Sequence, residues 1–207
     1  MCAGGGTGRR ARLRALWEII PWRFKSSPAH QNGMEIVALT VLILLALVLS
    51  VVLLFFSFYL VSVFVGAPFV PTSEDVTEAM LDIARVKVGD CFLDLGSGDG
   101  RLVIAAARRG ARAVGYEINP FLVLFSRWRI RRAGFARTAR VYWKNLWTVN
   151  CSFADVVGLY CLPRTMRHLE QKLYRELRPG SRVVSNAFEF IAWRSEGVVG
   201  SVRVYVR

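Results

Sequence analysis

A glycine-rich turn carries the strongest chemical signal in the 207-residue sequence. The apolar run 91–95 predicts a buried strand, a G-x-G-x-G stretch from Gly96 to Gly100 follows it, and Arg101 begins a segment with helical spacing. Glycines at such a turn let the backbone approach a ligand that a Cβ would exclude. The spacing differs from the G-x-G-x-x-G of dinucleotide dehydrogenases, which argues against a pyrophosphate cofactor. Backbone N–H groups at the start of the helix can receive a ligand carboxylate.

An acidic residue ends the next predicted strand, in register with this turn. Glu117 closes segment 113–117 and lies 23 positions after Asp94, which stands two residues before Gly96. A carboxylate at this strand end can accept hydrogen bonds from both ribose hydroxyls, as the acidic residue about 20 positions beyond a Rossmann glycine loop does. The turn alone also fits an ordinary strand-to-helix connection. Together the two segments predict a nucleoside-binding site.

Strand-like and helix-like segments alternate after Pro71, which is typical of a parallel α/β sheet. Thr72 or Ser73 can cap a first helix that runs to about Arg85. The elements expected after it are strand 91–95, helix 101–109, strand 113–117, helix 120–133, strand 141–143, strand 155–160, helix 165–177 and strand 182–187. The last twenty residues can supply a closing antiparallel pair.

A long hydrophobic segment precedes this region. Residues 36–65 contain no charged residue, no proline and no glycine, and they exceed the ~20 residues that a bilayer-spanning helix needs. We therefore expect a membrane-embedded segment in preference to a signal peptide or a buried core helix. Six basic residues against two acidic ones in 1–35 favour a cytoplasmic N-terminus, so a single span would export the region that follows. A re-entrant or interfacial hairpin would keep both flanks on one side, and both arrangements stay open.

The chain carries a net charge of +13, which favours acidic partners. Beside a membrane segment, anionic phospholipid is the favoured partner. Nucleic acid is the competing one, because residues 125–144 interleave aromatic and basic side chains. Helix packing explains those aromatic residues as well, and the sequence has no RNA-binding motif, so no nucleic-acid partner is expected. Four dispersed cysteines and two isolated histidines predict neither a metal site nor a disulfide framework.

Three regions are therefore expected. Residues 1–33 form a basic segment whose stretch 9–20 has the spacing of a short interfacial helix, although a disordered tail fits equally. Residues 34–66 are the membrane-embedded segment, and residues 67–207 form the α/β domain.

The motifs together resemble the class I, seven-strand S-adenosylmethionine-dependent methyltransferases over about residues 71–206. Four segments are similar to the membrane-anchored protein-lysine methyltransferases, a family with enzymes that act on adenine nucleotide translocase and on the c-subunit of ATP synthase: residues 68–72, 94–101, 115–120 and 144–147. The resemblance implies a Rossmann-like seven-strand sheet with helices on both faces, preceded by a membrane helix or hairpin. It also implies S-adenosylmethionine as cofactor and a lysine of a membrane protein as methyl acceptor. The alternatives are methylation of a lipid, quinone or other small molecule, and a non-catalytic S-adenosylmethionine-binding membrane protein.

Site residues follow from the same resemblance, position by position. Asp94 and the glycine loop would line the methionine part of the cofactor, Glu117 would hold the ribose, and Asn145 would flank the adenine where the family commonly has Asp. The expected cofactor-binding set is Asp94, Gly96, Ser97, Gly98, Gly100, Glu117, Asn145 and Leu146. Pro71, Thr72 and Tyr160 are the candidates for shaping the methyl-transfer pocket, although Tyr160 fits equally as a packed aromatic residue at a strand end.

The cofactor also constrains the location of the chain. The catalytic domain must face a compartment that contains S-adenosylmethionine, at a bacterial or archaeal cell membrane or at a mitochondrial inner membrane. The oligomeric state stays open.

Overall fold

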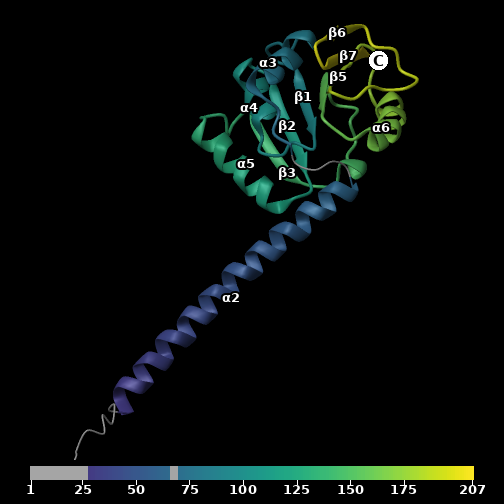
Figure 1. Ribbon diagram of the computed structural model, residues 1–207. Helices are drawn as coiled ribbons and strands as arrows, with labels where there is room; N and C mark the ends of the chain where they lie inside the picture. Colours follow the sequence, from purple (N-terminus) through teal and green to yellow (C-terminus); the bar gives the residue numbers. More distant parts are fainter. Residues whose placement is uncertain (1–27, 66–69) are drawn as a thin grey trace, which may run out of the picture. The chain divides into compact units, whose positions relative to one another are not determined.

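The computed structural model describes residues 28–65 and 70–207 (Figure 1). The interfacial helix expected within 9–20 lies outside the described residues, as does nearly all of the basic segment 1–33. The expected boundary between residues 66 and 67 also falls outside them, because residues 66–69 are not described.

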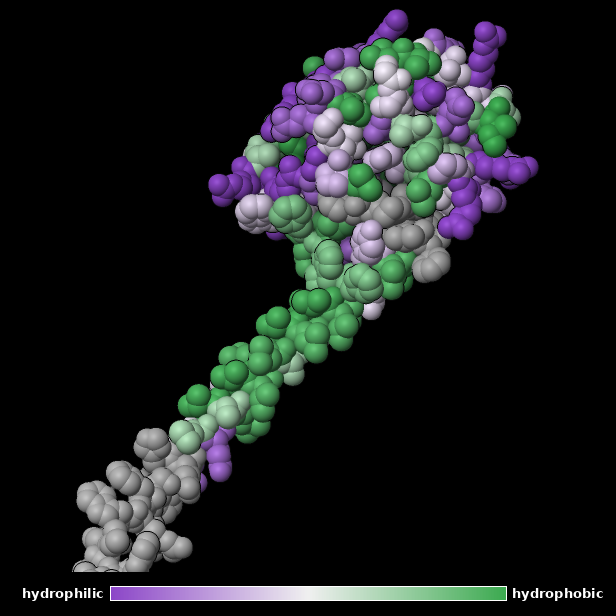
Figure 2. All heavy atoms as spheres, viewed as in Figure 1, coloured by the Kyte–Doolittle hydropathy of each residue, from purple (hydrophilic) through white to green (hydrophobic). Residues whose placement is uncertain are grey.

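Helix α2, Pro28–Val65, is one uninterrupted helix of 38 residues, or about 57 Å at the rise of an α-helix. Its part Asn32–Val61 contains an 18-residue stretch with a mean hydropathy of 3.3 and is long and apolar enough to cross a bilayer, whose hydrocarbon core is about 30 Å thick. Figure 2 shows hydrophobic residues along this helix. Within the apolar run, the hydroxyl groups of Thr40, Ser50 and Ser57 each donate to the carbonyl four residues earlier at 2.8 Å. The segment is therefore a single helix without the break that a hairpin requires.

The α/β domain contains a seven-stranded sheet in the order β3-β2-β1-β4-β5-β7-β6. Its strands are β1 Cys91–Leu95, β2 Arg112–Glu117, β3 Ala139–Trp143, β4 Val156–Leu159, β5 Arg182–Asn186, β6 Gly197–Val199 and β7 Val202–Val206. Strands β1 to β5 pair in parallel, and β7 lies antiparallel between β5 and β6. This confirms the parallel sheet and the closing antiparallel pair. The strand order reverses between β1 and β4, where open α/β sheets bind their ligands.

Helices cover both faces of the sheet, as expected (Figure 1). They are α3 Glu74–Ile83, α4 Arg101–Arg108, α5 Pro120–Arg132 and α6 Pro163–Glu176, and a 3-10 helix η1 spans Leu146–Thr148. Side chains alternate along β1: Phe92 packs in the core beneath α3, α4 and α5, whereas Leu93 and Leu95 pack in the core beneath α6. The apolar residues of β1 therefore fill two cores, which is why this strand is hydrophobic at successive positions apart from Asp94.

Helix α3 begins one residue after its cap. The Ser73 hydroxyl accepts a hydrogen bond from the N–H of Val76 at 3.4 Å, so Ser73 rather than Thr72 is the capping residue. The helix ends at Ile83, two residues before the expected Arg85, because Arg85 adopts a left-handed conformation with φ of 50°. This leaves Thr72 in the extended chain ahead of the helix.

Candidate functional site

A cavity lies at the carboxyl ends of β1, β2 and β4. Ten of the residues expected from the sequence line it: Pro71, Thr72, Asp94, Gly96, Ser97, Gly98, Glu117, Asn145, Leu146 and Tyr160. Gly100 does not. It caps α4 with φ of 77°, and a Cβ there would lie 2.9 Å from the Cβ of Ser126 in α5. Its lack of a side chain thus serves the packing of the loop against a helix.

The glycine loop is fastened to the end of β2 by backbone hydrogen bonds. The N–H groups of Gly96 and Ser97 both donate to the carbonyl of Tyr116, at 2.9 and 3.1 Å. Gly96 has φ of 90°, and no atom of the described residues lies within 4 Å of the position that a Cβ would take. The backbone at Gly96 therefore faces open space in the cavity, where a ligand can approach it closely.

Glu117 connects this loop to the start of α5. Its Oε2 accepts from the N–H of Gly98 at 2.9 Å and its Oε1 from the N–H of Asn119 at 2.8 Å. Burial raises the pKa of Glu117, and these backbone hydrogen bonds partly offset the rise. Because each carboxylate oxygen can accept more than one hydrogen bond, Glu117 can hold the loop and still accept from two ligand hydroxyls.

Asp94 is a buried carboxyl group close to other acidic residues. Burial, followed by the charges of Glu117 and Asp99, raises the pKa of Asp94 to about 8. Within the described part of the chain, the nearby hydroxyl of Ser97 is also buried without a hydrogen-bond partner. The ionised form of the Asp94 carboxyl group is therefore disfavoured, and the Ser97 hydroxyl has no partner. A ligand with a cationic, hydrogen-bonding group would stabilise the first and pair with the second.

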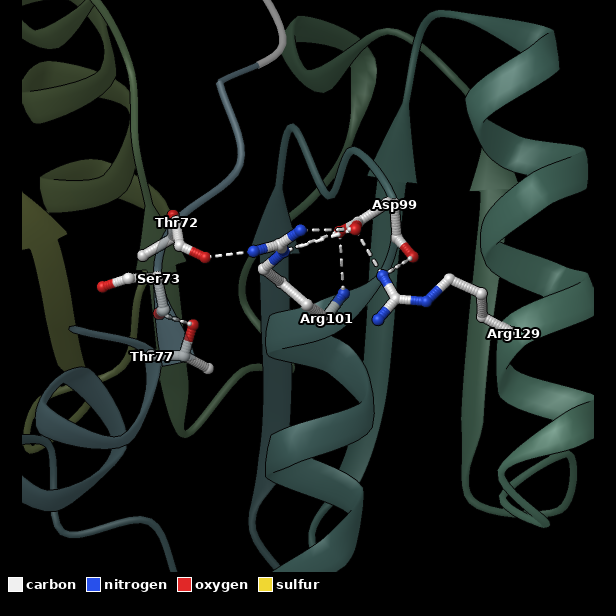
Figure 3. A network of polar contacts seen from close by, with 6 residues as sticks. All are labelled: Thr72, Ser73, Thr77, Asp99, Arg101 and Arg129. Atoms are coloured by element: carbon white, nitrogen blue, oxygen red, sulfur yellow. Dashed lines mark hydrogen bonds and ion pairs between the residues drawn. The ribbon is translucent and has the colours of Figure 1, made fainter. Parts of the chain in front are cut away.

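A charged network joins the glycine loop to the chain ahead of α3 (Figure 3). Arg101 donates to the Asp99 carboxylate at 2.8 Å and also to the carbonyl of Thr72. Arg129 of α5 forms a second ion pair with Asp99. Burial acts to raise the pKa of Asp99, but the hydrogen bonds from Arg101 and the charge of Arg129 more than offset it and hold the pKa below its usual value. The network positions Thr72 beside the cavity.

Sequence reasoning missed this network, along with other residues of the cavity wall. Arg101 was visible as the first residue after the glycine loop, but no sequence signal connects Arg129 to Asp99, 30 positions away. Leu159 and Cys161 also line the cavity and belong to segment 159–163, which the family resemblance places at the edge of the methyl-transfer site. The remaining lining residues that were not expected are Val70, Met80, Leu102, Tyr116, Ile118, Leu122 and Lys144.

Tyr160 and Asn145 lie at strand ends on the cavity wall. Tyr160 follows β4 and stacks on Phe188, with ring centroids 6.4 Å apart. Ala187, just before Phe188, has a positive φ of 66°, a conformation that is strained for alanine. Asn145 caps η1 by accepting from the N–H of Trp147 at 3.0 Å, a bond that orients its amide.

A Gly115→Ala substitution is expected to destabilise the domain by about 1–3 kcal/mol, the usual cost of overpacking a core. The new Cβ would lie 2.7 Å from the Cβ of Ser97 and 2.9 Å from Cγ2 of Val103. Ser97 would have to move, so ligand binding should weaken as well. Thermal unfolding of the full chain in detergent, followed by calorimetry, measures both effects. An unchanged melting temperature would show that the glycine loop tolerates displacement, and Gly33→Ala, whose Cβ would meet no described atom and whose φ is not positive, tests glycine removal without a clash or backbone strain.

Comparison with known proteins places these features in a family. The family model described as "ANTKMT methyltransferase domain" matches residues 94–197, which is half of the chain. The human lysine N-methyltransferase of the ATP synthase c-subunit is 43% identical over 133 residues, which cover 64% of this chain and 57% of that protein. A protein-lysine N-methyltransferase of Saccharolobus islandicus (strain REY15A) is 40% identical over 134 residues, which cover 64% of this chain and 83% of that protein.

A solved structure is similar as well. A Salinibacter ruber protein described as an RNA methyltransferase, in complex with S-adenosyl-L-homocysteine, is 42% identical with a TM-score of 0.63, and the match covers 66% of this chain and 91% of that one. The chain spans only a little over half the length of the vertebrate methyltransferases of the ATP synthase c-subunit that it matches. The matched family model and the coverage of the archaeal relative nevertheless establish that this chain belongs to the ANTKMT methyltransferase domain family.

Proposed function

We propose that the chain is an S-adenosylmethionine-dependent protein-lysine N-methyltransferase that acts on a membrane protein. The observation that carries the proposal is that two buried carboxyl groups, those of Asp94 and Glu117, line the same cavity as the glycine loop. Relatives named as lysine N-methyltransferases, in an animal and in an archaeon, support the same activity.

The residues of the cavity fit S-adenosylmethionine. Glu117 suits the two ribose hydroxyls, and Asp94 suits the cationic amino group of the methionine part. The open space at Gly96 and the unpaired hydroxyl of Ser97 leave room and a polar partner for the same part. Asn145 and Leu146, at the end of β3, would border the adenine. When bound, the cofactor supplies a methyl group already activated by a sulfonium centre.

The chain's own residues have to position the acceptor amine and exclude water. Pro71, Thr72 and Tyr160 line the cavity and are proposed to shape the entrance for the lysine side chain. Arg101 contributes indirectly, because it holds the carbonyl of Thr72. A lysine amine has to be neutral to attack, and desolvation in such an entrance lowers its pKa, so a dedicated general base is not obligatory.

Helix α2 and the relatives support a membrane-protein substrate. Relatives are named for action on the ATP synthase c-subunit and, in mouse, on adenine nucleotide translocase. A domain tethered to an apolar helix would meet acceptors embedded in the same bilayer. We propose that this bilayer is a cell membrane or a mitochondrial inner membrane and that the domain faces the side containing the cofactor.

Transfer of a tritiated methyl group tests the proposal. The purified full chain, native membranes and labelled S-adenosylmethionine are expected to yield a labelled protein band in which mass spectrometry finds methyl-lysine. A Glu117→Ala variant processed in parallel is expected to give no band. The absence of any labelled protein with the unaltered chain would contradict the proposal.

RNA methylation is the second candidate, because the Salinibacter ruber protein that is 42% identical is described as an RNA methyltransferase. The two candidates separate in the same experiment. Label that resists nuclease but is lost with protease favours the protein acceptor, and label with the opposite behaviour favours RNA. Label that extracts into organic solvent would instead indicate a lipid or quinone acceptor.

A further inference from the structure

The outer surface of α5 has a composition that the proposed function does not use. Aromatic residues in this part of the sequence were explicable as helix packing, and Phe135 does pack against the core. Leu124, Phe125 and Trp128, in contrast, point outward with 63%, 48% and 53% of their surfaces exposed. Helix packing therefore does not account for them, and large exposed apolar side chains gathered on one face indicate an interaction surface.

Basic residues surround these apolar side chains. Between Glu117 and Asp155 the sequence has seven basic residues and no acidic residue. Arg132 lies over the ring of Trp128, with its guanidinium carbon 5.7 Å from the ring centroid, and Arg129 lies 5.9 Å from the ring centroid of Phe125. Arg131 is exposed and, among the described residues, forms no ion pair. We call Leu124, Phe125, Trp128, Arg131 and Arg132 the α5 face.

We infer that the α5 face rests on anionic phospholipid headgroups. Aromatic and aliphatic side chains mixed with arginine are the composition of helices that lie in the membrane interface. Each basic residue near an anionic bilayer strengthens the attraction about fivefold, and no acidic residue of segment 118–154 opposes it. In Figures 1 and 2, α5 lies along one side of the domain, where hydrophilic and hydrophobic residues are interspersed.

Chain connectivity supports a lipid surface as the partner. Only residues 66–69 separate the end of α2 at Val65 from Val70, and this stretch spans at most about 18 Å. A bilayer crossed by α2 would therefore always lie close to the domain.

Single-stranded nucleic acid fits the same surface less well. Bases stack on open aromatic rings. Here Phe125 and Trp128 stack on each other, with centroids 5.8 Å apart, and arginine side chains lie over both rings. Leu124, the most exposed of the three apolar side chains, offers no stacking surface. The inference does not depend on the identity of the methyl acceptor.

Fluorescence quenching by brominated lipid tests the inference in the full chain. The protein is reconstituted into nanodiscs with brominated acyl chains, made either of phosphatidylcholine alone or with added phosphatidylglycerol. The contribution of Trp128 is the difference between the unaltered chain and Trp128→Phe. Trp193, which is buried against Phe190 and Tyr205 on the other face of the sheet, is measured in the same way through Trp193→Phe.

Quenching of Trp128 is expected in discs with phosphatidylglycerol, and its loss is expected in the double variant Arg131→Glu/Arg132→Glu. The matched variant Arg108→Glu/Arg112→Glu changes the net charge equally at exposed positions outside the α5 face and should retain the quenching. Trp128 quenched no more than Trp193 in every disc would overturn the inference. Equal quenching with and without phosphatidylglycerol would overturn the role of anionic headgroups. A Trp128 signal that responds to single-stranded RNA and not to brominated lipid would assign the face to nucleic acid instead.

Discussion

A Glu117→Ala variant is expected to bind S-adenosylmethionine at least about a hundredfold more weakly than the unaltered chain. The substitution removes the carboxylate that accepts from the N–H groups of Gly98 and Asn119 and, in our proposal, from both ribose hydroxyls. Hydrogen bonds to a charged group contribute about 1.5–3 kcal/mol each, so losing two of them accounts for the hundredfold or more. Isothermal titration calorimetry of the full chain in detergent measures the change.

Two further variants separate binding from folding. Glu117→Gln keeps the size of the side chain and one acceptor oxygen, so we expect it to bind with intermediate affinity. Glu196→Ala removes an exposed carboxylate just before β6 and should bind normally. A Glu117→Ala variant that melts at the unaltered temperature and still binds the cofactor with full affinity would show that the ribose is held elsewhere.

Cofactor affinity is expected to rise about tenfold per pH unit between pH 6 and 7.5, and Asp94→Asn should abolish most of this rise. Because the pKa of Asp94 is about 8, the carboxyl group is protonated over this range in the ligand-free protein. A cationic amino group favours the ionised form, so binding has to release the proton, and the ionised fraction falls tenfold for each unit below the pKa. The range ends at pH 7.5 because an α-amino group itself loses its proton near about 7.7–8.0.

Proton release can be measured directly. Calorimetry in buffers with different ionisation enthalpies should show close to one proton released per cofactor near pH 7, and much less for Asp94→Asn. Glu117 also has a raised pKa, so the difference between the two proteins, and not the total, reports on Asp94. Equal pH dependence in both proteins would mean that Asp94 does not face the cation.

Because the pKa of Asp94 is raised, the ligand-free protein also becomes less stable as the pH rises, whereas cofactor binding becomes stronger. The pKa of Asp94 in the folded state lies above its ordinary value of 3.8, so the folded state holds the proton more tightly than the unfolded chain. This stabilisation is complete below pH 3.8 and is lost as the pH rises to about 8, by at most about 1.4 kcal/mol per pH unit. Melting temperatures between pH 6 and 8.5 should therefore fall less for Asp94→Asn than for the unaltered chain.

Much of the fold and about half of the cavity lining could be predicted from local sequence. Strands β1, β4 and β5 are mostly apolar because they are buried on both faces, and the ends of all five parallel strands were predicted within two residues. Strand β1, the glycine loop and the start of α4 were predicted together because a strand, a tight turn and a helix are contiguous in the chain. Glu117 was predictable because parallel strands bring their carboxyl ends to one edge of the sheet.

The remaining features depend on side chains that meet from distant parts of the chain. Arg101 reaches the carbonyl of Thr72 across 29 positions, and Arg129 reaches Asp99 across 30. Phe188 meets Tyr160 only because a strained Ala187 turns the chain after β5. No periodicity in the sequence predicts these side-chain contacts, because they depend on helix placement and on rotamers.

The sequence by itself determined the order of elements, the glycine turn, the acidic residue at the end of β2 and the apolar length of α2, since each of these is a local property of neighbouring residues. Tertiary structure decided that Gly100 serves packing rather than the cavity, that α2 is one helix and that Phe125 and Trp128 face outward. It also decided the ionisation of Asp94, because the pKa of a carboxyl group depends on burial and on charges brought close by folding. The chemistry of the site therefore depends on residues visible in the sequence and on an electrostatic environment that only the folded domain creates.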